Sequence, residues 1–302
     1  MPLFESVVPG LKLLRVPFGD SWTGVVLVEG AHRILIDSGA LSSDVDDIVL
    51  PALKAEGLAL QDITYLVNTH SHGDHIGGYA RIRELAPGIT VVASDTDCKN
   101  VENPAALAIR TRGTHPDVSP APQSYLKGVK VNLVLHDGDV LDGTLKLLTT
   151  PGHDVGCVCW LHLPSGTAVT GDSLQGNGTP SEGIGFYQDL DLYRHSLRKL
   201  AEAGVENLLC GHDYDGIGYL VRGREAVNAA LNRCLAYTVR YQSFVDEQLR
   251  AGNTVPRNIA AGLVTAHGCG TPSYLFMAVY TVCEHIRQSA VTLSQYLLNM
   301  QT

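Results

Sequence analysis

The sequence predicts a four-layer α/β sandwich that carries a helical subdomain at its C-terminal end. The order of patterns along the chain indicates this: a β-rich stretch, a helix that follows a histidine-rich strand end, and a second β-rich stretch. From about residue 219 the pattern changes to long helices. We therefore expect a first domain over residues 1–215 and a helical extension over residues 216–302. A chain of 302 residues is long enough to bury a substantial core.

Short segments rich in β-formers fill the N-terminal part and are separated by Gly and Asp turns. The strands expected there are Leu11–Val16, Thr23–Glu29, His32–Asp37, Ile63–Asn68 and Thr90–Ala93. Apolar residues at helical spacing predict helices over Asp44–Glu56, ending at Gly57, and over His75–Ala86. Residues 99–128 contain four prolines and are expected to form an irregular loop, which in a compact domain is usually functional or mobile.

The second half repeats the β pattern and then becomes helical. Its expected strands are Val129–Leu135, Thr144–Thr150, Val155–Leu163, Ala168–Thr170 and Asn207–Cys210. Its expected helices are Asp189–Ala203, Arg224–Ala251, Pro256–His267 and Tyr274–Leu298. No internal repeat is visible.

Composition excludes several classes of partner. The net charge is −9 with no basic block, which disfavours nucleic acid because phosphate contacts need clustered Lys and Arg. No charged segment followed by an apolar one opens the chain, and no apolar run reaches the roughly 18 residues of a spanning helix, so we expect neither secretion nor a membrane. Seven scattered cysteines, among them Cys157 and Cys159 as expected buried thiols, indicate a reduced, cytoplasmic protein.

The most informative segment is Thr69-His70-Ser71-His72-Gly73-Asp74-His75. It places three imidazoles and a carboxylate within six residues, a density that packing alone does not require. Imidazole nitrogen and carboxylate oxygen are ligands that zinc and similar divalent metals prefer. His70 and His72 point the same way in extended chain, whereas Asp74 and His75 follow on the turn into a helix. The arrangement suits two adjacent metal positions.

Three further strand ends repeat this chemistry beside a glycine. His153 follows Gly152, Asp172 follows Gly171, and His212 follows Gly211. Each is a weak signal alone, because a single His in a loop is common. Together with the dense motif they predict one convergent site.

These segments resemble the motifs of the metallo-β-lactamase-fold superfamily, over residues 11 to about 215. His70, His72, Asp74 and His75 match its His-x-His-x-Asp-His signature, and Asp37 in Leu35-Ile36-Asp37-Ser38-Gly39 matches its first motif. His153, Asp172 and His212 match its third, fourth and fifth motifs. The resemblance implies an αββα sandwich with metals at the sheet edges.

The resemblance also implies a ligand set for two divalent ions. His70, His72 and His153 would hold one ion; Asp74, His75 and His212 would hold the other; Asp172 would bridge them. Zinc is favoured, with iron or manganese also open. Asp37 is expected to fix a ligand or a loop, although a turn-forming Asp before Ser38 and Gly39 explains it equally well.

The implied chemistry is hydrolysis. Two divalent ions lower the pKa of a shared water toward neutrality, giving a metal-bound hydroxide that attacks a carbonyl or phosphoryl centre. Asp74 is the expected catalytic residue, because it can bind metal and orient the hydroxide. We expect a dinuclear hydrolase of a small-molecule substrate with an activated acyl bond, thioester in preference to lactone or ester.

Several branches of the superfamily remain open at this stage. The ligand set and the helical extension resemble glyoxalase II-like thioester hydrolases, but the loop after Asp172 differs. Lactonases of the fold carry a tyrosine where this chain has Gln175, so a lactonase would need another acid such as Tyr187 or Tyr193, which packing explains better.

Two non-hydrolytic alternatives also stand. Residues 151–158 and 212–216 resemble segments of persulfide dioxygenases, which would use one iron on His70, His153 and Asp172. An effector that acts by binding a partner through residues 216–302 is the third class, and the same helices could form a homodimer. Residues 99–128, 175–188 and the C-terminal helices are expected to line the pocket mouth.

Overall fold

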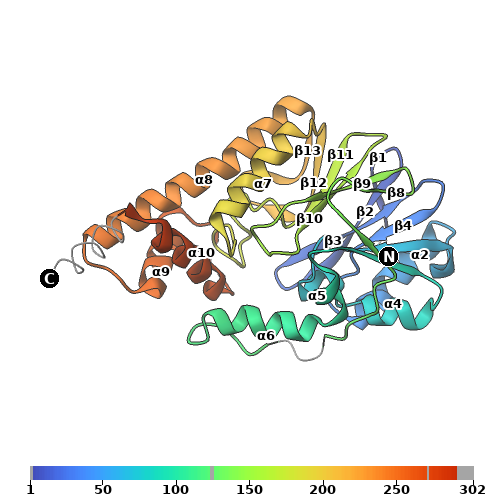
Figure 1. Ribbon diagram of the computed structural model, residues 1–302, viewed down its shortest axis with the longest axis horizontal. Helices are drawn as coiled ribbons and strands as arrows, with labels where there is room; N and C mark the ends of the chain where they lie inside the picture. The colour runs from blue at the N-terminus through green and yellow to red at the C-terminus, as the bar shows by residue number, and fades with distance from the viewer. Residues whose placement is uncertain (1–2, 123–125, 271, 291–302) are drawn as a thin grey trace.

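The computed structural model describes residues 3–122, 126–270 and 272–290, and these form two facing sheets with helices outside each (Figure 1). The first sheet has seven strands, which lie side by side in chain order. They are β1 (Glu5–Val8), β2 (Leu11–Phe18), β3 (Ser21–Val28), β4 (Arg33–Ile36), β5 (Ile63–Val67), β6 (Thr90–Ser94) and β7 (Leu133–Leu135). Strands β1 to β4 are antiparallel, whereas β4 to β7 are parallel.

The second sheet has six strands in the order β13-β12-β11-β10-β9-β8. They are β8 (Val140–Leu141), β9 (Leu145–Thr149), β10 (Val158–His162), β11 (Thr167–Gly171), β12 (Asn207–Tyr214) and β13 (Gly218–Arg222). The pairing of β11 with β12 is parallel and the others are antiparallel. Strand β13 lies within the range 216–302 that the sequence assigned to the helical extension, so the helices begin only at Arg224.

Three apolar cores separate the layers. One lies between the sheets and includes Ile36, Leu147 and Trp160, which are fully buried. A second joins the outer face of the first sheet to its helices, and a third joins the second sheet to the C-terminal helices. The expected four-layer sandwich is therefore confirmed.

The helices of the N-terminal half form in shorter pieces than the sequence predicted. They are α1 (Ser42–Asp44), a π-helical turn (Val45–Val49), α2 (Leu50–Ala55), a 3₁₀ turn (Leu60–Asp62), α3 (Gly73–Ile76), α4 (Tyr79–Leu85), α5 (Cys98–Glu102) and α6 (Pro104–Thr114). The helix expected over His75–Ala86 breaks at Gly77, where the chain passes so close to the carbonyl of Ala40 that a Cβ would lie 1.8 Å from its oxygen.

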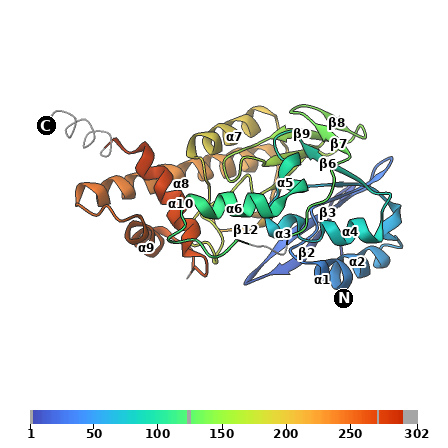
Figure 2. The same cartoon turned by 60° about the horizontal axis from the view of Figure 1, so that its bottom comes forward.

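The expectation of an irregular segment over residues 99–128 is wrong for α5 and α6. Pro104, one of the four prolines on which that expectation rests, occupies the first turn of α6, where the missing N–H is tolerated. The side chain of Asn103 caps this helix by accepting a hydrogen bond from the backbone N–H of Ala106. Figure 2 shows α6 running from α5 toward α10.

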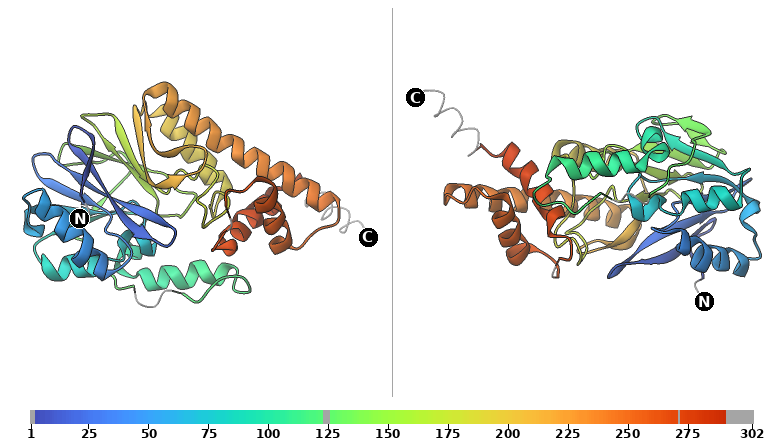
Figure 3. Two further views of the ribbon diagram at one scale, coloured as in Figure 1. Left: turned by 180° about the vertical axis from the view of Figure 1, so that it is seen from behind. Right: turned by 90° about the horizontal axis from the view of Figure 1, so that it is seen from below.

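The C-terminal helices match the predicted pattern closely. They are α7 (Leu190–Glu202), α8 (Arg224–Arg250), α9 (Pro256–His267) and α10 (Leu275–Gln288). Helix α8 packs beside α7 and extends past the second sheet, and α9 and α10 pack against its far part (Figure 3). The predicted continuation of the last helix over residues 291–298 lies outside the described residues. Among the described helices, none combines the length and hydropathy needed to cross a membrane.

Candidate metal centre

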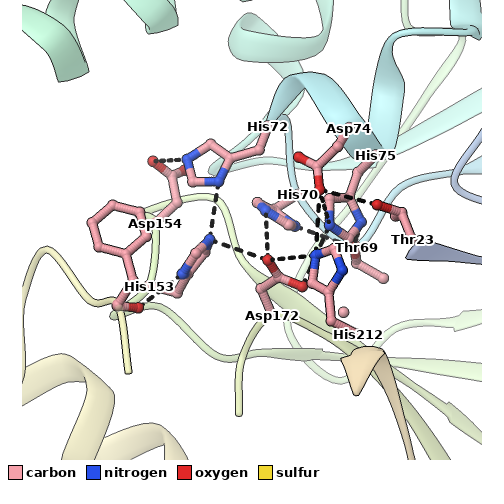
Figure 4. Close-up of polar contacts among 12 residues, drawn as sticks. Thr23, Thr69, His70, His72, Asp74, His75, His153, Asp154, Asp172 and His212 are labelled. Carbon is pink, nitrogen blue, oxygen red and sulfur yellow. Dashed lines mark hydrogen bonds and ion pairs between the residues drawn. The ribbon is translucent and has the colours of Figure 1, made fainter. Parts of the chain in front are cut away.

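All seven predicted ligands meet at one edge of the sandwich, because each follows or ends a strand there (Figure 4). The segment after β5 carries His70 and His72, and α3 begins directly after His72 with Asp74 and His75 in its single turn. His153 follows β9, Asp172 follows β11, and His212 lies toward the end of β12. The carboxyl ends of the parallel strands thus supply most of the site.

The side chains form three overlapping sets that could each hold a cation. The sets are His70, His72 and His153; His70, His75 and Asp172; and Asp74, His75 and His212. Within each set the candidate ligand atoms all lie within 4.8 Å of one another. The first and third sets share no residue, so they define two adjacent positions.

Asp172 lies between these two positions. Its Oδ2 is 3.5 Å from Nε2 of His153, which belongs to the first set, and 3.4 Å from Nε2 of His212, which belongs to the third set. Its Oδ1 is 3.4 Å from Nε2 of His75. A carboxylate in this place can contact a cation in either position.

The donor atoms at the centre fit a divalent metal. Among the described residues, Nε2 of His70, Nε2 of His75 and Oδ1 of Asp172 are buried without a hydrogen-bond partner. Unsatisfied polar atoms of this kind normally cost free energy and are rare in folded proteins. They converge on the same space, and a bound cation would satisfy all three.

In His153 and His212, a hydrogen bond at Nδ1 fixes the ring so that Nε2 points toward the space between the candidate ligands. Nδ1 of His153 lies 2.9 Å from the carbonyl oxygen of Phe186, and Nδ1 of His212 lies 2.6 Å from that of Trp22. A carbonyl oxygen only accepts, so each Nδ1 carries the proton and each Nε2 keeps its lone pair for a metal. His72 differs: its Nδ1 faces the cluster, 2.9 Å from Nε2 of His153.

Burial and charge divide the histidines into two groups. Burial holds the pKa of His70 well below its ordinary value and lowers that of His153 to about 4, so both imidazoles are neutral as metal binding requires. Burial also opposes protonation of His75, but neighbouring carboxylates outweigh it and raise the pKa of His75 to about 10. The carboxylate-rich half of the site therefore attracts positive charge.

Asp37 directs a ligand and stands outside the three sets. Its carboxylate accepts three hydrogen bonds of 2.8 Å each. Two come from Thr69, from its backbone N–H and its Oγ1, and one comes from Nδ1 of His75. Burial raises the pKa of Asp37, although His75 and Thr69 oppose the rise. Of the two sequence-based interpretations, the contacts match the one in which Asp37 fixes a ligand.

Sequence reasoning missed Asp97, which supports the loop that carries the histidines. Its Oδ2 accepts hydrogen bonds of 2.6 Å from Asn68 and from Ser71, on either side of His70. Its Oδ1 accepts a further one from Asn100. Burial raises the pKa of Asp97 to about 6. No local motif marks this residue, since it lies 26 positions beyond Ser71 and meets it only in the fold.

A cavity of about 280 Å³ opens above the cluster. His72, Asp74, His153, Asp172 and His212 contribute to its lining. The three segments expected to line the mouth contribute to it: α6 together with Pro120, Ala121 and Leu126, residues 179–186, and residues 274–277 at the start of α10. Apolar side chains dominate these walls, as in pockets for small molecules.

The two tyrosines considered as alternative acids do not line this cavity. The hydroxyl of Tyr187 lies 2.7 Å from Nε2 of His285, within the C-terminal core, and that of Tyr193 accepts a 3.1 Å hydrogen bond from the N–H of Gln175. Burial raises the pKa of both well above the ordinary value. Both tyrosines pack in the core, as the sequence analysis favoured, and neither faces the cavity as the acid of a lactonase would.

Comparison with known proteins identifies the superfamily to which this chain belongs. Residues 17–212 match the sequence profile of the metallo-beta-lactamase superfamily. A metallo-beta-lactamase family protein from Thermus thermophilus has the same fold, with a TM-score of 0.72 at 21% identity over 94% of this chain and 95% of that one. The FEZ-1 metallo-beta-lactamase of Legionella gormanii aligns with a TM-score of 0.57 at 18% identity, over 80% of this chain and 98% of that one.

Curated relatives are similar over part of the chain. A hydroxyacylglutathione hydrolase of Cereibacter sphaeroides is 33% identical over 153 residues, covering 50% of this chain and 49% of the relative. An atrochrysone carboxyl ACP thioesterase of Aspergillus fumigatus is 28% identical over 200 residues, covering 66% of this chain and 51% of the relative. The chain thus spans about half the length of these relatives.

The chain belongs to the metallo-beta-lactamase superfamily. Its fold and its His and Asp clusters define it further as a metallohydrolase of that superfamily.

Proposed function

We propose that this protein hydrolyses the activated acyl bond of a small molecule, a thioester in preference to a lactone or simple ester, at a centre for two divalent ions. The observation that carries the proposal is the pair of disjoint ligand sets joined by Asp172 beneath an apolar cavity. The names of the two curated relatives, one a hydroxyacylglutathione hydrolase and one an ACP thioesterase, support the preference for a thioester.

The proposed ligand roles follow the geometry. His70, His72 and His153 would hold one ion, Asp74, His75 and His212 the other, and Asp172 both. Zinc is the metal we favour, because imidazole and carboxylate ligands suit it. When bound, two such ions lower the pKa of water toward neutrality and polarise a carbonyl oxygen.

The side chains around the ions prepare the site for this chemistry. Thr23 donates a 3.1 Å hydrogen bond to Oδ2 of Asp74, which leaves Oδ1 free to accept from a water in the cavity. We propose that Asp74 orients this water and accepts its proton at Oδ1. The apolar walls exclude bulk water and receive the acyl part of the substrate.

Metal analysis combined with a substrate panel tests the proposal. The purified protein is assayed for bound metals and for hydrolysis of thioester, lactone and phosphodiester substrates. About two divalent ions per chain with fastest turnover of thioesters is the expected result. One iron per chain with oxygen consumption on a persulfide substrate would instead establish the dioxygenase alternative, and turnover limited to phosphodiesters would overturn the acyl assignment.

A further inference from the structure

One face of α6 lines the cavity and changes character along the helix. The contributing residues are Pro104, Leu107, Ala108, Thr111 and Arg112. Their spacing of three and four places them on a single stripe. The stripe is apolar over its first part and becomes polar at Thr111 and Arg112. At a rise of 1.5 Å per residue, Arg112 lies about 12 Å along the helix from Pro104.

A chain of aromatic contacts runs from the candidate metal ligand His153 to Arg112. The ring of Phe186 lies 5.0 Å from that of His153, and Tyr280 lies 5.9 Å from Phe186, measured between centroids. Phe276 follows at 6.0 Å from Tyr280, and the guanidinium carbon of Arg112 lies 4.3 Å over the Phe276 ring. Phe186 and Phe276 line the cavity, and the buried ring of Tyr280 contacts both of them. The cavity therefore has the candidate metal centre beside Phe186 and a cation over Phe276.

The guanidinium of Arg112 has no acidic partner in the part of the chain that the structure describes. No ion pair joins it to a carboxylate of the described residues, and its polar neighbours are the phenol groups of Tyr280, which shares a hydrogen bond with it, and Tyr274. Burial lowers the pKa of Arg112. Other arginines, such as Arg81 and Arg224, pair with carboxylates at the surface. Arg112 is also the sole Lys or Arg side chain among the described residues that line the cavity.

This environment favours an anion as the missing partner. A half-buried guanidinium over an aromatic face has lost part of its hydration, and an ion pair with good geometry would compensate for that loss. A single cation matches a single negative charge. A phosphate dianion fits less well, because one guanidinium compensates one negative charge and Glu182 lines the same cavity.

We propose that Arg112 binds a carboxylate of the substrate, so that the protein acts on acyl compounds carrying one negative charge, with their apolar part against Phe186 and Phe276. This inference rests on the proposed hydrolase function and narrows its substrate class. Arg112 is a specificity-determining residue in this proposal and takes no part in bond cleavage.

Matched substrates separate charge recognition from packing. The first series contains S-acetyl thioesters of ω-mercapto acids with three to six carbons, and the second contains thioesters whose acyl part is a dicarboxylic acid. Each is paired with its uncharged N-methylamide. Zinc-loaded wild-type protein is compared with Arg112→Gln, Arg112→Lys and a control, Arg240→Gln. Arg240 also lies over an aromatic ring, that of Tyr237, but on the exposed surface of α8.

The expected result is that at least one chain length shows a kcat/KM ten- to a hundredfold higher for the acid than for its amide. Arg112→Gln should remove this preference by raising KM for the acid, while kcat for the amide should change less than twofold. Arg112→Lys should retain part of the preference, and Arg240→Gln should retain all of it.

Calorimetry with uncleavable thioether analogues, each as the acid and as the amide, tests whether Arg112 recognises the carboxylate without relying on turnover. Charge-selective binding that disappears in Arg112→Gln supports the role of Arg112 even if no thioester is cleaved, in which case only the proposed function fails. Equal binding and equal turnover of acid and amide by wild-type protein would overturn the inference and leave the hydrolase function intact. A lower Tm in Arg112→Gln without any loss of charge selectivity would show that Arg112 only packs on Phe276.

Discussion

The carboxylate of Asp37 lies 2.8 Å from Nδ1 of His75, although 38 positions separate the two residues. A carboxylate accepts here, so His75 keeps the proton on Nδ1, and Nε2, 3.4 Å from Oδ1 of Asp172, is the nitrogen that would release its proton to bind a metal. Thr69 donates twice to the same carboxylate and keeps it in place. Asp37 thereby sets both the tautomer and the direction of a candidate metal ligand.

Replacing Asp37 with Asn should weaken metal binding without unfolding the protein. Asn is nearly the same size and tolerates the left-handed backbone of this residue, whose φ is 63°. Its amide donates where the carboxylate accepted, which favours the His75 tautomer with a proton on Nε2 and blocks that atom as a ligand. We expect metal affinity to fall roughly 10- to 100-fold, measured by competition with a chelator. An unchanged affinity would show that Asp37 has no influence on His75.

Asp74→Asn should abolish most turnover while the fold persists. The amide keeps the shape of the carboxylate but loses its charge and its capacity to accept a proton from water. We expect kcat to fall roughly 10²- to 10⁴-fold, and His72→Ala to lose turnover on a similar scale. Asp47→Asn is the matched control, because Asp47 is an exposed carboxylate on the outer helical segment. Wild-type rates in purified Asp74→Asn would contradict the proposed mechanism.

Gly171→Ala should disturb the centre through the backbone. Gly171 has a φ of +49°, and a Cβ there would lie 2.3 Å from Oγ1 of Thr69, the residue that holds Asp37. Backbone strain and the forced shift of Thr69 should together lower the free energy of unfolding by about 2–4 kcal/mol, measured by urea titration. Gly143→Ala isolates the strain, because Gly143 has a φ of +66° with no atom within 4 Å of the added Cβ. Equal losses in the two variants would rule out the effect on Thr69.

The sequence predicted which His and Asp side chains come together because their signal is local. His70 to His75 lie within one short segment, and the other ligands each follow a run of β-formers beside a glycine. The fold class followed from the order of β-rich and helical stretches along the chain. Candidate metal ligands can therefore be recognised in this sequence where strand ends supply them.

Contacts between distant segments could not be read in this way. Asp97 supports Ser71 and Asn68, and Arg112 lies over Phe276, but no spacing in the sequence connects these pairs. Helix α6 was missed because a proline suits both a loop and a first helical turn. The short edge strands β1 and β13 were missed because their pairing partners, rather than their own composition, define them.

We expect the protein to lose folding stability in acid because of the buried residue His285, whether or not a metal is bound. Its Nε2 lies 2.7 Å from the hydroxyl of Tyr187 and its Nδ1 2.8 Å from Oε1 of Gln242, so the buried ring is neutral and fully hydrogen-bonded. Burial, with a smaller effect from Arg194, lowers the pKa of His285 to about 3. The unfolded chain, with a pKa near 6.5 for this group, takes up a proton in the range between these values while the folded protein does not.

Stability contributed by neutral His285 is therefore complete above about pH 6.5 and is lost progressively as the pH falls toward about 3. Between pH 7 and pH 5 we expect this group alone to cost the wild-type protein about 2 kcal/mol. His285→Gln removes the titrating ring, so its free energy of unfolding, although lower at pH 7, should fall less steeply over the same range in urea titrations. His195→Gln is the control, because His195 is exposed on α7; its profile should follow that of the wild type. A His285→Gln profile parallel to the wild type from pH 7 to pH 5 would mean that the buried imidazole accepts its proton in the folded protein.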